Sequence, residues 1–182
     1  MEKLVSMPKF LELKSFLDYD NREKYFIKLP SGLYISKKRT LPNSTWFEAN
    51  HQLQEKGFNM PTIPEFLEFL EYIKENNPEV HEEVTGIRSP WRAEWLDADF
   101  NILYGELNIN SRHFSYNGEL ITIKSEPLNE TTLPENCLNI RGDNNSVARF
   151  VTDEVHSGLC VDGYPSNRYE DLGVRAVRHG FE

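Results

Sequence analysis

The sequence predicts an α+β fold, and three observations support this class. Strand-like segments lie near both ends of the chain, at Tyr25–Leu29 and Val174–Arg178. Between them, two segments open with the capping-box pattern of a helix N-terminus, at Thr45 and Thr62. The pair Asn117-Gly118, flanked by segments of period two, indicates a β-hairpin. Helices between terminal strands favour an architecture in which the two ends of the chain pair in one sheet.

The chain opens with a segment that we predict to lie outside the folded domain. Residues 1–22 are expected to form an N-terminal arm, with a short helix from about Lys9. Residues 23–182 are long enough to bury a core and are predicted to form a single domain. A hairpin begins this domain, because Leu33–Ser36 follows the turn residues Pro30-Ser31-Gly32.

The first long helix is predicted from its two ends. Thr45 supplies an N-cap hydroxyl, and Glu48 follows at the third helical position, where its carboxylate can accept from the Thr45 backbone. The helix should run to about Glu55. Gly57 is the expected stop, because glycine adopts the left-handed conformation without strain.

The second long helix repeats this pattern with Thr62 and Glu65. Pro64 is tolerated in its first turn, where the missing N–H would have no helical partner. The residues Asn76-Asn77-Pro78 should end the helix.

Residues 79–101 show no clear period and are predicted to be irregular. His81-Glu82-Glu83 lacks the second histidine of an H-E-x-x-H metal motif, so an exposed loop is the favoured interpretation. Trp91 and Trp95 lie four residues apart. Such a pair usually fills a core, and the alternative is that it covers a binding site.

Period two returns after residue 101. We predict a strand at Ile102–Ile109, then a hairpin from Arg112 to Ile123 around Asn117-Gly118, and a surface loop at 125–136. Three further strands are predicted at Leu138–Arg141, Ala148–Val151 and Val174–Arg178.

Composition limits the classes of function. The formal net charge is −9 and the sequence pI is about 5.1, so the surface should repel nucleic acid, and Lys37-Lys38-Arg39 is interpreted as a solvated turn. The N-terminus shows no signal-peptide pattern, and no apolar segment approaches the roughly 20 residues of a membrane span. We therefore expect a soluble protein that is cytoplasmic or associated with a particle, with no membrane span.

Several short motifs, in this order, resemble one known family. They are Thr45–Asn50 (TWFEAN), Gly57–Phe66 (GFNMPTIPEF), Arg141-Gly142, Ala148-Arg149 and Leu172–Arg175 (LGVR). Together they resemble a C-type lectin-like domain of the formylglycine-generating-enzyme (sulfatase-modifying-factor) branch, which includes the variable proteins of diversity-generating retroelements. This resemblance implies a C-type lectin-like fold with paired terminal strands over residues 23–182. The chain departs from the family pattern at Asp143, Asn145 and Val174, which replace a glycine, a tryptophan and a phenylalanine.

The catalytic and metal features of the family do not carry over. A formylglycine-generating enzyme should have two closely spaced cysteines that bind copper, whereas Cys160 has no neighbouring thiol and Cys137 lies far upstream. The two cysteines are interpreted as small apolar residues, and they could form a disulfide only if the fold brings them together. Leu128, in the segment nearest to a calcium-dependent sugar motif, cannot bind a cation. A structural calcium ion remains open, with Asp143, Asp153 and Glu154 as its candidate ligands.

The resemblance implies instead a ligand-binding surface at residues 143–169. Tyrosine provides a large, rigid contact area, and asparagine and serine provide adaptable hydrogen bonds. The alternative is an ordinary polar surface loop. The implied contact residues are Asp143, Asn144, Asn145, Ser146, Arg149, His156, Ser157, Tyr164, Ser166, Asn167, Arg168 and Tyr169.

These observations predict a non-catalytic protein that binds a protein or glycan ligand, without a cofactor. Two alternatives remain open. The first is a modifying enzyme of the formylglycine-generating or another metal- and oxygen-dependent type. The second is a structural protein of a virus or phage.

Overall fold

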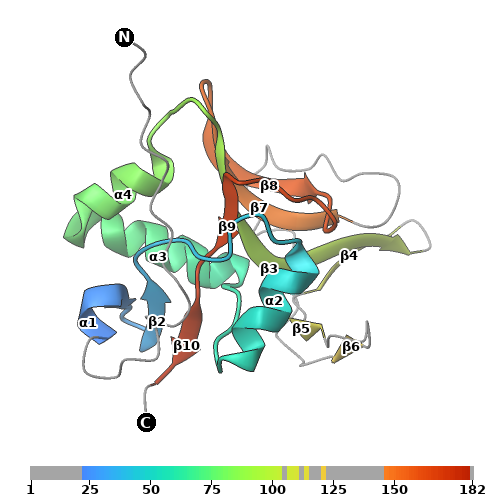
Figure 1. Cartoon of the computed structure of the whole chain (residues 1–182), viewed down its shortest axis with the longest axis horizontal. Coiled ribbons are helices and arrows are strands. Elements are labelled where there is room, and N and C mark those ends of the chain that lie inside the picture. Colours follow the sequence, from blue (N-terminus) through green and yellow to red (C-terminus); the bar gives the residue numbers. More distant parts are fainter. Residues whose placement is uncertain (1–21, 104–105, 111–112, 115–119, 122–145, 181–182) are drawn as a thin grey trace.

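The computed structural model describes residues 22–103, 106–110, 113–114, 120–121 and 146–180, and it confirms the α+β class. These residues form a three-stranded sheet, a five-stranded sheet and a separate strand pair (Figure 1). That pair, β5 (His113–Phe114) with antiparallel β6 (Leu120–Ile121), agrees with the predicted hairpin. The predicted helix from Lys9, the Asn117-Gly118 turn and the segments predicted at 125–141 lie outside the described residues.

The small sheet joins the two ends of the domain. The one-turn helix α1 (Arg22–Tyr25) leads into β1 (Phe26–Lys28), which pairs antiparallel with β2 (Leu33–Ser36). β10 (Val177–His179) adds to the other edge of β2, also antiparallel. The prediction that N- and C-terminal strands share a sheet is therefore confirmed.

Both long helices begin and end as predicted. α2 (Trp46–Glu55) has a complete capping box, in which Thr45 Oγ1 accepts from the Glu48 N–H at 3.2 Å and Glu48 Oε2 accepts from the Thr45 N–H at 3.0 Å. Gly57 follows with φ of 73°. α3 (Ile63–Asn76) repeats the capping box with Thr62 and Glu65.

The prediction of an exposed loop at His81-Glu82-Glu83 is wrong, because these residues lie in α4 (Pro78–Thr85). Proline suits the first turn of this helix. Arg88 covers the other end by donating to the Glu82 carbonyl at 3.3 Å and to the Glu83 carbonyl. Val84 anchors the helix because its side chain is fully buried.

The large sheet has the order β4-β3-β7-β8, with β9 beside β3. β3 (Arg92–Leu103) is the central strand, and it pairs antiparallel with β7 (Ser146–Thr152) and with β4 (Glu106–Asn110). β8 (Ser157–Gly163) continues from β7, while β9 (Leu172–Val174) runs parallel to β3. The strand predicted at Ala148–Val151 is confirmed within β7.

Two strand predictions are corrected by this sheet. Residues 102–109 do not form one strand, because β3 ends at Leu103 and β4 returns antiparallel from Glu106. The predicted closing strand Val174–Arg178 divides between the two sheets, since β9 ends at Val174 and β10 begins at Val177. Arg175 and Ala176 cross between the sheets, and both residues are fully buried.

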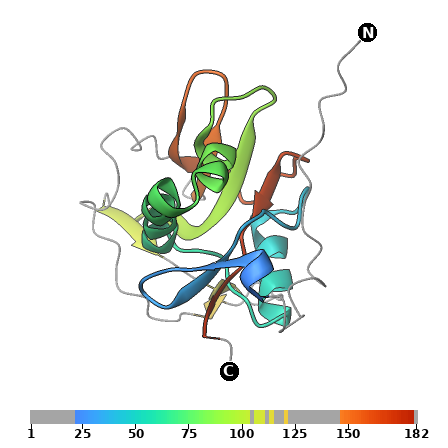
Figure 2. The same cartoon turned by 90° about the vertical axis from the view of Figure 1, so that its left-hand side faces the viewer.

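The core has one apolar cluster on each face of the large sheet. α3 packs against one face through Phe66 and Phe69, and the inner side of the small sheet completes this cluster. α2 packs against the other face through Trp46, Ala49 and Leu53. Figures 1 and 2 show α3 and α2 on different sides of β3. Since both faces are covered, nearly every residue of β3 from Arg92 to Phe100 is buried.

Candidate functional site

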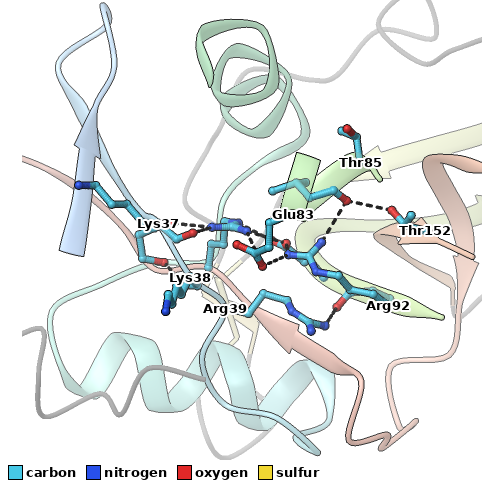
Figure 3. A network of polar contacts seen from close by, with 12 residues as sticks. Lys37, Lys38, Arg39, Glu83, Thr85, Arg92 and Thr152 are labelled. Atoms are coloured by element: carbon cyan, nitrogen blue, oxygen red, sulfur yellow. Dashed lines mark hydrogen bonds and ion pairs between the residues drawn. The ribbon is translucent and has the colours of Figure 1, made fainter. Parts of the chain in front are cut away.

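A network of buried charges lies where the two sheets and α4 meet. We call Arg39, Glu83, Arg92, Glu94 and Arg175 the buried charge network. Figure 3 shows Arg39 from the segment after β2, Glu83 from α4 and Arg92 from β3 pointing toward one another. Glu94 lies on β3 as well, and Arg175 lies in the β9–β10 crossing. Of its five members, only Glu83 has a substantially exposed side chain, at 38%.

Glu94 is the centre of this network and has no exposure to solvent. Its Oε2 lies 2.8 Å from Arg175 Nε, and its Oε1 accepts from Arg175 Nη2 at 3.1 Å and also from Arg92 Nη2. Burial alone would raise the pKa of Glu94. The positive charges of the surrounding guanidinium groups outweigh it and lower that pKa below its usual 4.5. The carboxylate is therefore charged at neutral pH.

The network also connects α4 to the sheet. Arg92 Nη1 donates to the Val84 carbonyl at 3.2 Å, and the Thr152 hydroxyl donates to the same oxygen at 2.9 Å. Glu83 Oε1 accepts from Arg92 Nη2 at 3.3 Å. Arg175 Nη1 donates to the Ser36 carbonyl at 2.8 Å, and this hydrogen bond connects the β9–β10 crossing to β2. These contacts make the network a structural junction.

The prediction of a solvated turn at Lys37-Lys38-Arg39 is wrong for Arg39, because the side chain of Arg39 is buried. Its Nη1 donates to the Ala93 carbonyl at 3.0 Å and to the Asp171 carbonyl. Burial, together with the charge of Arg92, lowers the pKa of Arg39 to about 9, so the group stays protonated at neutral pH. Asp171 is the last residue before β9, and Arg39 therefore secures one end of the preceding loop.

That loop, residues 164–171, leaves β8 and returns to β9 across the N-terminal end of α2. Its backbone is held at several points. The Trp46 N–H donates to the Pro165 carbonyl at 2.9 Å, and the Asn43 N–H donates to the Tyr169 carbonyl at 3.1 Å. Within the loop, the Asn167 N–H donates to the Tyr164 carbonyl at 3.1 Å.

The side chains of the 164–171 loop point largely to solvent. Tyr164 and Tyr169 are 37% and 45% exposed. Arg168 forms an ion pair with Glu48 of α2. The Tyr169 ring packs edge-to-face on Trp91, with 5.3 Å between ring centroids. Trp95 is completely buried, which confirms the core prediction for this residue, and Trp91 is half-buried and packs against the same core cluster.

The structure separates the twelve predicted contact residues into groups. Asp143, Asn144 and Asn145 lie outside the described residues, and Ser146 is buried in β7. Arg149 points toward Asp162 of β8, at 3.2 Å. The remaining residues form two groups at opposite ends of β8, about 20 Å apart at ~3.3 Å per residue, and all of them are exposed except the half-buried Asn167. His156 and Ser157 form one group, and Tyr164, Ser166, Asn167, Arg168 and Tyr169 form the other.

The His156 end of β8 is a short turn that pairs with its own residues. Asp153 Oδ1 accepts from the backbone N–H groups of Val155 at 2.8 Å and His156 at 2.9 Å, and Oδ2 lies 2.8 Å from His156 Nδ1. The two backbone hydrogen bonds are the main reason that the pKa of Asp153 lies below its usual range. Among the described residues, no group of three or more His, Cys, Asp or Glu side chains is arranged to hold a metal ion.

Two residues that contact the 164–171 loop, Trp91 and Glu48, were not among the predicted contact residues. Trp91 had one signal in the sequence, which was the alternative that a tryptophan of this pair covers a binding site. Glu48 had none, because its role as a helix cap already explained it, and its partner Arg168 is 120 residues away.

Comparisons with protein-family models, curated proteins and solved structures found no match for this chain. None of the helices in the described residues has both the length and the apolar character needed to cross a membrane.

Proposed function

We propose that this protein is a non-catalytic binding protein that contacts a protein or glycan ligand through the 164–171 loop. The observation that carries this proposal is the contrast between the backbone and the side chains of the loop. The backbone is tied to α2, to the segment before it and to Arg39, whereas the tyrosine, serine and arginine side chains face solvent. A loop that is ordered before binding loses less conformational entropy when it binds.

The types of residue in this loop support the same proposal. Tyrosine and arginine are frequent in binding hot spots, and serine and asparagine supply adaptable hydrogen bonds. Tyr164, Ser166, Asn167, Arg168 and Tyr169 lie within six consecutive residues. The paired terminal strands and the capped helices α2 and α3 are compatible with a C-type lectin-like scaffold, which is the finer fold that we propose.

The test is to sequence the 3′ end of this gene in many cells of its source population. We propose further that this binding surface is variable, so that substitutions should concentrate at the codons for Tyr164 to Tyr169. Gly163 and Leu172–Val174 should stay constant, because they are buried in the sheet. Buried Ser146 serves as an internal control and should also stay constant. A loop as invariant as α2 and α3 would contradict the variable-protein proposal.

A further inference from the structure

We propose that the partner at the 164–171 loop is a polypeptide that presents a cationic side chain, arginine or lysine, to the Trp91–Tyr169 aromatic pair. This inference rests on the proposed function and adds the chemical class of the partner. It depends on three features of the loop, which are its aromatic pair, its charge and its rigid support.

The aromatic pair provides the contact face. Tyr169 is 45% exposed and is held edge-to-face against the half-buried Trp91. The faces of tyrosine and tryptophan attract a guanidinium or ammonium group through the negative potential of the ring. Contact with Trp91 also limits the movement of the tyrosine ring, so that less entropy is lost on binding.

The charges beside this pair favour a cation. Arg168, the only basic residue of the loop, is engaged in an ion pair with Glu48. Glu170 and Asp171 directly follow Tyr169, and neither side chain forms an ion pair with another described residue. The whole chain carries a formal net charge of −9, which would attract a basic partner over a longer range.

A polypeptide accounts for this surface better than a glycan does. The exposed carboxylate of Glu170 and the half-buried one of Asp171 complement a charged side chain, whereas a neutral sugar does not neutralise them. The ion pair between Arg168 and Glu48 also extends the surface onto α2. A partner that covers the loop, Trp91 and the end of α2 requires an extended surface of its own, which a polypeptide has.

The experiment selects peptides from a random 12-residue display library on the full-length protein. Enriched peptides are synthesised, and their Kd values are measured by titration calorimetry at low and high salt. We expect enriched peptides to contain arginine or lysine, and their binding to weaken with rising salt. Tyr169→Ser should weaken binding about tenfold or more, as expected for a hot-spot side chain. The double variant Glu170→Gln/Asp171→Asn should weaken it severalfold.

Matched controls separate the local charge from the total charge. Glu75→Gln/Glu154→Gln removes two negative charges from exposed positions elsewhere and should leave the Kd within about twofold. Circular dichroism and thermal unfolding of each variant verify that the fold is retained. If the two double variants weaken peptide binding equally, the proposal that Glu170 and Asp171 form a local cation site is overturned.

The remaining outcomes distinguish this inference from the proposed function. Enriched peptides without basic residues, or a glycan on an array that binds in a Tyr169-dependent way, would overturn the cationic polypeptide and leave the binding function standing. Binding of peptides and glycans that is unaffected by Tyr169→Ser would overturn both.

Discussion

At the scale of single residues, the main feature of this protein is one buried carboxylate that attracts several guanidinium groups. Replacement of a buried ion pair by apolar groups can be neutral, but removal of one partner leaves the others charged and unsolvated. Glu94 contacts Arg92 and Arg175 directly and attracts Arg39. Its removal therefore affects three cations together.

We expect Glu94→Gln to lower the free energy of unfolding by about 3–5 kcal/mol, because the amide keeps the shape of the side chain and loses its charge. Glu83→Gln is the matched control, since Glu83 contacts Arg92 at 3.3 Å but is partly exposed. This change should lower the free energy by less than about 1 kcal/mol. Urea unfolding followed by tryptophan fluorescence measures both variants. Equal losses would show that Glu94 is not the centre of the network.

A second residue, Glu48, links helix stability to pH. The pKa of Glu48 is lowered, chiefly by the hydrogen bond from the Thr45 backbone and also by Arg168. A carboxylate with a lower pKa in the folded state adds stability above its unfolded pKa, and this stability is lost as the pH falls through the folded pKa. The benefit should therefore be present at pH 7 and absent in strong acid.

The corresponding experiment compares the urea midpoints of wild type and Glu48→Gln from pH 7 to pH 3. Glutamine can still accept from the Thr45 N–H, so that the comparison isolates the charge. We expect wild type to be the more stable at pH 7 and the difference to shrink below a pH of about 4.5. A difference that is constant across this range would contradict the assigned role of the charge.

At the scale of elements, β8 determines where the 164–171 loop begins. Gly163 is the last residue of β8, and a Cβ at this position would lie 2.8 Å from the Val147 carbonyl oxygen and 3.1 Å from the Trp95 ring. Gly158 lies near the start of the same strand, and a Cβ at this position would meet nothing within 4 Å. The two glycines thus form a matched pair within one element.

We expect Gly163→Ala to destabilise the fold by about 1–3 kcal/mol, because the backbone of β7 must move away from the added methyl group. Gly158→Ala should change stability by less than about 0.5 kcal/mol. Thermal unfolding measures both effects. Hydrogen exchange at residues 164–171 should increase in Gly163→Ala alone, and equal exchange in the two variants would show that β8 does not position the loop.

The same scale explains which elements could be predicted from the sequence. α2 and α3 were predicted because their capping boxes are local patterns, complete within four residues. β3 was missed because Arg92, Glu94 and Asp97 are charged residues that occupy buried positions of a central strand. Their burial depends on partners such as Arg175, which is 81 residues from Glu94. The spacing of apolar residues within a short segment cannot indicate a contact between residues so far apart in the sequence.

At the scale of the whole molecule, only part of the candidate site could be predicted, because the rest depends on contacts between residues that are distant in the sequence. The loop residues Tyr164 to Tyr169 were proposed as contact residues from their type, which is a local property. Their separation from His156 and Ser157 follows from β8, a strand that the sequence did not indicate. The contribution of Trp91 depends on the fold as well, since β9 lies parallel to β3 and brings Tyr169 beside it.

The pairing of β10 with β2 should decide whether the domain folds as one unit. Val177 is buried, and it exchanges two backbone hydrogen bonds of 2.9 Å with Asn59 in addition to its pairing with Ile35. Removal of residues 177–182 would expose the edge of β2 and one side of the core under α3. We expect this truncated chain to lose cooperative urea unfolding, because β10 pairs with β2 and also binds the backbone of Asn59 in the segment before α3.

Removal of residues 180–182 alone is the control, since it leaves β10 (Val177–His179) intact. This shorter truncation should keep the urea midpoint of wild type. Hydrogen exchange at Leu33–Ser36 separates the two cases further, because these residues lie next to β10 and should lose protection in the longer truncation alone. If both truncated chains unfold cooperatively at the wild-type midpoint, the small sheet does not close the domain. The 164–171 loop would then depend on the large sheet and the buried charge network alone.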